Sequence, residues 1–238
     1  MNTYTMTNDA TTSTEEQTSG EQTPASTRRK RLNDKARALL VQLAEWHPQL
    51  FGDAPAPLKR GIFQDLAAAH PDVPHTALRA ALRQHTSSTR YLKALADGGA
   101  RLGLDGQESE AVAPEHIWQA LAALFARRSQ RPGADLQEQR RWLRRRAMRA
   151  WQGSGLTPAA WEHAALTQGS QGEDADAALQ AAMQDAAAYA ARSEALLRAF
   201  EGQQQSEAAF AADWGLHPLE AARQLALARR LRAAAAPA

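Results

Sequence analysis

Five prolines of this chain each stand directly ahead of an apolar repeat whose period is close to 3.6 residues. These prolines are Pro57, Pro74, Pro114, Pro158 and Pro218. Proline fits the first turn of an α-helix, where its missing N–H group is not needed, and it breaks a helix interior. Only 6% of the residues are aromatic, so alanine and other small helix-forming side chains must supply much of the core. The sequence therefore predicts a mainly α-helical protein.

Composition and charge divide the chain into four predicted segments. Residues 1–32 form a polar leader with little to bury, which predicts disorder, and this leader ends in a basic run. Residues 33–128 carry regular apolar repeats and form the predicted globular domain. Residues 129–152 form a predicted basic helix, and residues 153–238 form a helical accessory region. The basic charge thus lies in two short blocks around a nearly neutral domain, an arrangement that attracts polyanions.

One part of the domain departs from the helical pattern. Residues 101–106 and 111–113 read as two short strands around an Asp-Gly turn, a common hairpin signal. Elsewhere the helical periodicity holds, and Leu58, Ile62 and Leu66 fall on one stripe of a predicted helix. The predicted fold is therefore five helices with one small β-hairpin in the domain, followed by a helical C-terminal extension.

Cationic and hydroxyl side chains surround one predicted helix junction. Arg79 and Arg83 stand four residues apart, so they project from one face of a helix. The run Thr86–Thr89 then places four hydroxyl residues ahead of a new apolar pattern that includes Tyr91, as at a helix N-terminus. Unpaired amides at such a terminus, helped by the helix dipole, can bind phosphate. The pattern indicates a nucleotide site, and the alternative is an ordinary cap with solvated arginines and a core tyrosine.

Several blocks of this region occur in a recognisable order and spacing. They are Pro57–Lys59, Gly61–Leu66, Leu78–Arg83, Thr86–Ser88, Arg90–Leu92, Gly99–Arg101 and Leu104–Gly106. Together they resemble the ProQ/FinO family of bacterial RNA-binding proteins, from near Asp34 to near Arg128. The resemblance implies a small, mainly helical domain whose concave face binds RNA.

The same resemblance implies an RNA chaperone that acts in post-transcriptional regulation. Its partners would be small RNAs and messenger 3′ ends, particularly terminator hairpins with a single-stranded 3′ tail, and the 3′ end would lie around Thr86–Ser88 beside Tyr91. The residues and the resemblance together give the predicted RNA-binding set Lys59, Arg79, Arg83, Thr86, Ser87, Ser88, Arg90, Tyr91, Lys93 and Arg101. Because A-form stems offer a protein mainly backbone and 2′-hydroxyl groups, recognition by hairpin shape and chain end is physically reasonable.

The basic helix after the domain is a possible secondary RNA contact. Its candidate residues are Arg140, Arg141, Arg144, Arg145 and Arg149. Each phosphate neutralised by such a side chain would add to the salt dependence of binding. The alternative is that the helix docks Trp142 and Trp151 against its neighbours while the arginines are solvated, and the sequence leaves both interpretations open.

The C-terminal part suggests the runner-up function. Residues 206–231 have the rhythm of a helix-turn-helix, which would suit a DNA-binding regulator. However, residues 152–238 hold six arginines against ten acids, and a net acidic segment makes a poor phosphate footprint. DNA binding is therefore disfavoured, and a helical accessory domain or self-association element is preferred.

Enzymes, metal sites and membrane proteins are not indicated. The chain has no cysteine, and its seven histidines form no HExxH or comparable metal-binding pair. No phosphate-binding loop or dinucleotide glycine pattern is present. There is also no signal-peptide pattern and no apolar run long enough to span a membrane. We therefore expect no catalytic residue, no cofactor, no metal, no membrane contact and a cytoplasmic location.

Overall fold

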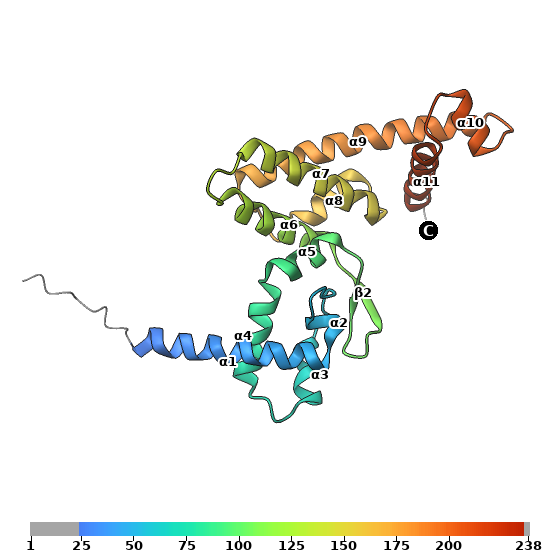
Figure 1. The fold of residues 1–238 in the computed structure, drawn as a ribbon. Helices are drawn as coiled ribbons and strands as arrows, with labels where there is room; N and C mark the ends of the chain where they lie inside the picture. Colours follow the sequence, from blue (N-terminus) through green and yellow to red (C-terminus); the bar gives the residue numbers. More distant parts are fainter. Residues whose placement is uncertain (1–23, 236–238) are drawn as a thin grey trace, which may run out of the picture.

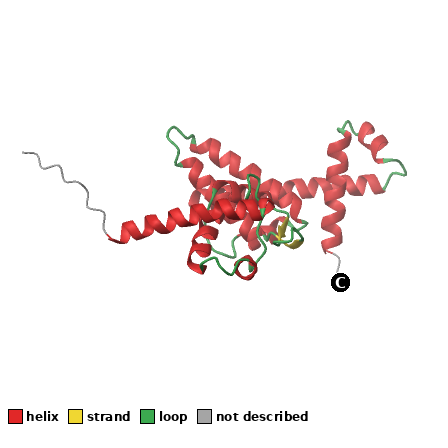
Figure 2. Ribbon diagram, turned by 60° about the horizontal axis from the view of Figure 1, so that its bottom comes forward, coloured by secondary structure: helices red, strands yellow, loops and turns green. Residues whose placement is uncertain are grey.

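The computed structural model describes residues 24–235, with side chains from residue 32 onward (Figure 1). In this part of the chain, eleven helices are joined to one small antiparallel sheet. Figure 2 shows the same arrangement by element type, with the sheet as a small feature among the helices. The mainly α fold with a β-hairpin and a helical C-terminal extension, predicted from the sequence, is confirmed.

The elements fall into an N-terminal and a C-terminal half of the chain. The N-terminal half contains α1 (Pro24–Trp46), α2 (Pro48–Phe51), α3 (Ile62–Ala69), α4 (His75–Thr86), α5 (Thr89–Asp97), β1 (Ala100–Leu102), β2 (Glu108–Ala111) and α6 (Pro114–Ser129). The C-terminal half contains α7 (Leu136–Ser154), α8 (Pro158–Ala165), α9 (Glu173–Glu201), α10 (Glu207–Asp213) and α11 (Pro218–Ala235). Five helices predicted for the globular domain correspond to α1, α3, α4, α5 and α6, and α2 adds a single turn.

The first helix begins earlier than the sequence suggests. The apolar repeat starts near Asn33, but α1 begins at Pro24, so residues 24–32 of the predicted leader are helical. A proline in the first turn followed by arginine, lysine and leucine favours helix even where no apolar stripe exists. The rest of the predicted leader, residues 1–23, lies outside the described residues.

A first hydrophobic core joins α1 to α5. Its buried side chains include Leu39 and Leu43 of α1, Leu66 of α3 and Leu78 of α4. Helix α1 packs along α4, and the chain between them returns through α2 and α3 (Figure 1). This core therefore fixes α4 and α5, the two helices that carry most of the predicted site.

The helix expected directly after Pro57 begins later, at Ile62. Residues 57–59 are extended and pair with the hairpin, because Leu102 N–H donates to the Pro57 carbonyl at 2.8 Å and Lys59 N–H donates to the Leu102 carbonyl at 2.9 Å. Gly61 has φ 81°, a left-handed conformation that glycine adopts without strain, and it starts α3. The prediction of a continuous helical stripe was wrong here, because strand-like pairing competes with the helix.

The predicted hairpin forms around the Asp-Gly turn, but its second strand is Glu108–Ala111 and not the predicted 111–113, and the first is shorter than predicted. Strands β1 and β2 pair antiparallel with Ala100 opposite Ala111 and Leu102 opposite Glu108, and the register shifts between these two pairs. The turn contains Gly106 at φ 73°, which suits glycine in an Asp-Gly turn. Because β1 also contacts the extended segment ahead of α3, the hairpin holds residues 57–59 beside β1 in the predicted domain.

A second hydrophobic core surrounds α6. This helix is buried along several faces, and Trp118, Leu121 and Phe125 are among its buried side chains. Helices α7 and α8 supply Trp151 and Trp161, and α9 completes the layer. A helix that is apolar nearly all round must be covered on both sides. Helix α6 is therefore shared: it packs on α5 below and on α7 and α8 above.

The last helices extend beyond this body. Helix α9 runs past α7 and α8, α10 lies at its far end, and α11 crosses back toward the body (Figure 1). A small third core at the crossing buries Leu197, Phe210 and Leu225. The predicted helix-turn-helix segment is thus two helices joined by a short turn, held against the end of α9.

Candidate nucleic-acid interface

The predicted helix start at the hydroxyl run is the N-terminus of α5. Ser88 is its N-cap, and its Oγ accepts a hydrogen bond from the Tyr91 amide at 3.1 Å. The amides of Thr89 and Arg90 have no acceptor among the described residues. Two donors at the positive end of a helix dipole can bind an anionic oxygen.

The two hydroxyls ahead of this cap belong to the preceding helix. Thr86 is the last residue of α4, and its Oγ1 donates to the Leu82 carbonyl at 2.8 Å. Ser87 follows the helix, and its Oγ donates to the Gln84 carbonyl at 3.1 Å. These hydroxyls close the end of α4, whereas Ser88 opens α5. The junction therefore bends the chain so that the end of one helix meets the start of the next.

An arginine that the sequence did not indicate lies directly on this junction. Nη2 of Arg127 donates to the Ser87 carbonyl at 2.6 Å, and Nη1 donates to Oγ1 of Thr89 at 3.0 Å. Arg127 comes from the end of α6 and is exposed. No spacing in the sequence connects it to the hydroxyl run. The contact exists because α6 packs on α5.

Three predicted cations are exposed and have no carboxylate partner in the described part of the chain. They are Arg79, Arg83 and Lys93. Arg79 lies over the Phe63 ring, with its guanidinium carbon 4.9 Å from the ring centroid. Arg83 lies one turn ahead of Ser87 on α4, and Lys93 one turn beyond Thr89 on α5. Positive side chains therefore lie on both sides of the junction.

Two further predicted cations are exposed but paired. Nζ of Lys59 lies 3.0 Å from a carboxylate oxygen of Asp65, and Nη1 of Arg90 lies 2.8 Å from one of Asp53. The hydrogen bond to Asp65 raises the pKa of Lys59 above its ordinary value. Exposed pairs of this kind are weak, about 0–1 kcal/mol, so a phosphate can displace the carboxylate.

Tyr91 and Arg101 have structural contacts instead of the predicted free ones. Tyr91 is only 4% exposed, and its Oη accepts from the Leu58 amide at 3.1 Å. Arg101 is 6% exposed, and its Nη1 donates to the Leu58 carbonyl at 2.9 Å. Their expected roles as a stacking ring and a phosphate contact require accessible atoms. In this structure both side chains hold the extended segment ahead of α3 against the hairpin.

A carboxylate next to Arg101 is strongly acidic. Hydrogen bonds from the Ser109 hydroxyl and from backbone amides, including that of Arg60, together with the charge of Arg101, lower the pKa of Glu110 to about 2. Glu110 therefore stays ionised and offsets positive charge at the hairpin. The positive potential of the domain lies instead around α4, α5 and the end of α6.

A shallow depression adds one more cation beside the start of α5. It lies between α1, the loop after α2 and α5, and it is lined by Arg37, Phe51, Asp53 and Arg90 among others. Arg37 is exposed and was not predicted as a site residue. It lies on the same face of α1 as Val41, which is also exposed. Cations from α1, α4, α5 and α6 therefore surround the α5 N-terminus.

Most arginines of the predicted secondary contact are neutralised within the protein. The ion pairs on α7 are Arg140–Asp174, Arg141–Asp135, Arg144–Asp185 and Arg146–Asp97. Arg144 is the best formed, with Nε 2.5 Å from the carboxylate, and this contact lowers the pKa of Asp185 and raises that of Arg144. Of the five predicted residues, only Arg145 and Arg149 have no carboxylate partner among the described residues. Helix α7 therefore uses its charge mainly to dock on α9.

The C-terminal helices show a similar pattern where they face one another. Arg229 pairs with Glu207, and Arg232 pairs with Glu194 and Glu201. These pairs hold α11 against α9 and α10. Nothing in this geometry favours the predicted DNA-binding alternative.

The described residues hold neither a candidate metal site nor a candidate membrane-spanning helix. No group of three or more histidine, aspartate or glutamate side chains is arranged to hold a metal ion. No helix in residues 24–235 has the length and the apolar content that a membrane crossing requires. The site that can be described is therefore the cationic junction of α4, α5 and α6.

The chain was compared with protein families and with known proteins. The model of the ProQ/FINO family matches residues 33–137. The RNA chaperone ProQ of Aeromonas salmonicida is 47% identical over 95 residues, which are 37% of this chain and 45% of that protein. The RNA chaperone ProQ of Idiomarina loihiensis is 47% identical over 88 residues, 34% of this chain and 42% of that protein. The chain thus spans less than half of the length of these relatives.

A solved structure is also similar to part of this chain. A FinO-like RNA chaperone from Neisseria meningitidis MC58 is 27% identical to this chain, with a TM-score of 0.34, and it covers 43% of this chain and 98% of its own. The family match ends within α7, so α8 to α11 lie beyond it. Residues 33–137 of this chain belong to the ProQ/FINO family.

Proposed function

We propose that this protein is an RNA-binding protein and RNA chaperone that recognises structured RNAs such as terminator hairpins with a single-stranded 3′ tail. The names of its relatives support RNA as the ligand. The observation that carries the proposal is the α4–α5 junction, where Arg127 holds the Ser87 carbonyl and the Thr89 hydroxyl beside two open amides. In this proposal the protein acts in post-transcriptional regulation in the bacterial cytoplasm.

The proposed binding mode separates the stem from the tail. The stem presents phosphates at A-form spacing, and the exposed heads of Arg79, Arg83 and Lys93 contact them without reading the sequence. The tail ends at the α5 N-terminus, where the amides of Thr89 and Arg90 donate to terminal oxygens. Recognition then depends on hairpin shape and on a free chain end.

The site proposed here differs from the predicted set in three respects. Arg37 and Arg127 are added because both lie beside the α5 N-terminus. Tyr91 and Arg101 act indirectly, by holding the segment that carries Lys59. Thr86 and Ser87 shape the junction, whereas Ser88 positions the open amides by capping α5.

The proposal is tested by binding of a labelled terminator hairpin to the full chain. We expect Arg83→Gln combined with Arg127→Gln to weaken binding by about thirtyfold or more, because each of the two charge-assisted phosphate contacts contributes roughly 1–3 kcal/mol. The matched control is Arg144→Gln, which removes an exposed arginine that is paired within the protein. Circular dichroism monitors the fold of each variant.

A second measurement addresses the chain end. Removing the 3′ tail, or blocking its terminal hydroxyl, should weaken binding to the wild-type protein and have less effect on the double variant. If a blunt RNA duplex binds as tightly as the tailed hairpin, the assignment of the α5 N-terminus to the 3′ end is wrong. If duplex DNA binds as tightly as the hairpin, the assignment to RNA is wrong.

A further inference from the structure

A small cavity lies outside the family domain, where the end of α7 meets α9 and α11. Its volume is about 200 Å³, and it is lined by Gln152, Tyr189, Arg223, Ala226, Leu227 and Arg230. The polar groups come from three different helices, so the cavity exists only when the C-terminal helices are packed. Its size leaves room for roughly six waters, or for one phosphate group with part of its hydration shell.

Arg223 and Arg230 line this cavity, and Arg192 lies near Tyr189 beside it; we call these three arginines the α9/α11 cluster. None of them has a carboxylate within ion-pair distance among residues 32–235. Arg192 and Arg223 both lie close enough to Tyr189 to lower the pKa of its phenol, although burial and the hydrogen bond to Glu220 together raise it to about 12. The cluster is therefore a concentration of unpaired positive charge on one rigid surface.

The lack of partners is selective, because neighbouring arginines on the same helices are paired. Arg198 of α9 pairs with Glu194, while Arg229 and Arg232 of α11 pair with acids of α9 and α10. Arg223 and Arg230, which form no such pair, line the cavity. Glu220 lies near Arg223 and Asp185 lies near Arg192, but the cluster keeps an excess of positive charge that an external anion can bind.

The cavity also positions its cations. Nη2 of Arg230 donates to the Gln152 carbonyl at 3.1 Å near the end of α7, which leaves its remaining N–H groups available. The Tyr189 hydroxyl donates to Glu220 at 2.9 Å, and Gln224 donates to the same carboxylate at 3.0 Å. These two neutral partners hold Glu220, and the nearby charge of Arg223 also lowers the pKa of this carboxyl group. A guanidinium fixed in this way is suited to binding phosphate oxygens in a bidentate manner.

The spacing of the arginines favours a polymer over a single ion. Arg223 and Arg230 are seven residues apart on α11, so they lie on one face and about 10 Å apart along the axis. Both side chains line the same cavity, which has room for one phosphate, but Arg192 is not among its lining residues, so one ion in the cavity does not contact the whole cluster. Successive phosphates of a nucleic-acid backbone can contact all three arginines.

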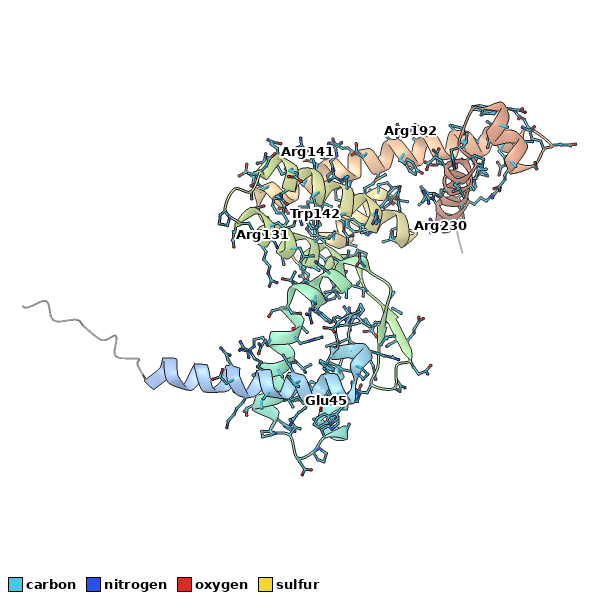
Figure 3. All side chains as sticks on the ribbon, in the orientation of Figure 1. Glu45, Arg131, Arg141, Trp142, Arg192 and Arg230 are labelled. Atoms are coloured by element: carbon cyan, nitrogen blue, oxygen red, sulfur yellow. The ribbon has the colours of Figure 1, made fainter. Side chains whose placement is uncertain are left out.

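The cluster lies away from the proposed hairpin site. Figure 3 shows Arg192 on the outer half of α9 and Arg230 near the end of α11, whereas Arg131, in the α6–α7 turn, lies at the other end of the body formed by α6 to α9. Arg127, which holds the α4–α5 junction, comes from the end of α6 next to that turn. Two RNA segments bound at these two places would not compete for the same surface.

We propose that Arg192, Arg223 and Arg230 form a second phosphate-binding surface, which holds the backbone of another RNA segment while the family domain holds a hairpin. This inference rests on the proposed function. Its consequence is that one protein molecule brings two RNAs together, which is the physical requirement for a chaperone that promotes pairing between strands. The surface does not distinguish base sequences, because guanidinium–phosphate contacts carry no sequence information.

The test measures how many equivalents of RNA the full-length chain binds. A labelled terminator hairpin is added first, and a second RNA strand without that label is added afterwards. We expect wild-type protein saturated with hairpin to bind the second RNA. Arg223→Gln combined with Arg230→Gln should leave hairpin affinity within about twofold and weaken the second binding at least tenfold. The salt slope of the second step should fall by about 1.4–1.8, since each lost phosphate contact contributes roughly 0.7–0.9.

The matched control is Arg229→Gln combined with Arg232→Gln, which removes the same number of charges from the same helix but takes paired side chains. This control should retain the second binding, provided that circular dichroism shows the helices intact. Hairpin-saturated wild-type protein that binds no second RNA overturns the inference and leaves the proposed function standing. Wild-type protein that binds no hairpin overturns both. If poly-glutamate or inorganic phosphate, added at the same concentration of negative charge, displaces the second RNA, the assignment to an RNA backbone is wrong.

Discussion

The two large cores of this protein differ in whether the arginines on their surfaces are paired with carboxylates. The first core, between α1 and α5, encloses polar side chains such as His85, Tyr91 and Arg101, and leaves the heads of Arg79 and Arg83 in solvent. The second core, around α6, is built from tryptophan, leucine and alanine, and most arginines on its surface are paired with aspartates. In sequence the arginines of α4 and α7 look alike. Their partners distinguish a binding surface from a docking surface.

The difference shows that positive charge alone does not identify a nucleic-acid site. Helix α7 is the most basic stretch of the chain, yet α9 supplies Asp174 and Asp185 to neutralise it. Helix α4 has fewer arginines, and no carboxylate of the described residues approaches Arg79 or Arg83. Available charge depends on contacts between elements that are distant in sequence.

The largest expected effect concerns α6, the helix that packs on α5 on one side and on α7 and α8 on the other. Trp118 is fully buried, so Trp118→Ala should lower the free energy of unfolding by about 3–5 kcal/mol through lost burial and the cavity left behind. Chemical denaturation with circular dichroism measures the loss. The control is Trp214→Ala, because that side chain is half exposed. A comparably small loss for both variants would show that α6 is not the centre of the second core.

The next effect is a pH dependence that belongs to the first core. Burial between Phe51 and Tyr91 lowers the pKa of His85 to about 4, so the folded protein keeps this imidazole neutral. The unfolded chain takes up that proton near pH 6.5, so stability should be full above this pH and fall progressively as pH drops toward 4. We expect a loss on the order of 2–3 kcal/mol over this window. Beyond it, at still lower pH, this histidine contributes no further change.

Substitution identifies the group responsible. His85→Leu should reduce the loss of stability between pH 6.5 and 4, whereas His163→Leu, at an exposed position of α8, should not. Urea denaturation at a series of pH values gives the comparison. An unchanged pH profile in His85→Leu would mean that another group controls the acid transition.

The smallest effect separates two arginines of the same domain. Arg101→Ala should cost about 2 kcal/mol of stability, because the Leu58 carbonyl loses a charged donor in a buried setting. Arg79→Ala should leave stability nearly unchanged and weaken RNA binding, because its head is exposed over Phe63. Thermal unfolding and hairpin binding are measured on both variants. A reversed pattern would exchange the structural and binding roles of the two residues.

Much of the fold follows from local chemistry and could be predicted. Pro114, Pro158 and Pro218 each begin a helix, and Pro74 is the residue directly ahead of one, because proline suits these positions. The Asp-Gly turn gives the hairpin for a similar local reason. Pro57 does not begin a helix, because the backbone of the segment after it pairs with β1, more than forty residues away in the sequence. No periodicity within the segment reports such pairing.

The candidate site also has residues that could be predicted from local spacing and residues that could not. Ser88 as the cap of α5, and Arg79 and Arg83 as exposed neighbours, follow from spacing within a helix. The burial of Arg101 does not, because it depends on the extended segment packed across the hairpin. Arg127 was missed because its contact with Ser87 spans two helices and the hairpin between them. A search for basic residues at the end of the last helix of the domain would have included it.

The sharing of α6 also limits how this protein can be divided. A fragment that ends at Ser129 would expose Trp118, Leu121 and Phe125 to water, although the sequence of the family domain is nearly complete there. Such a fragment would tend to aggregate, since large contiguous apolar patches drive association. The C-terminal helices therefore contribute to the stability of α6 whether or not they bind a ligand.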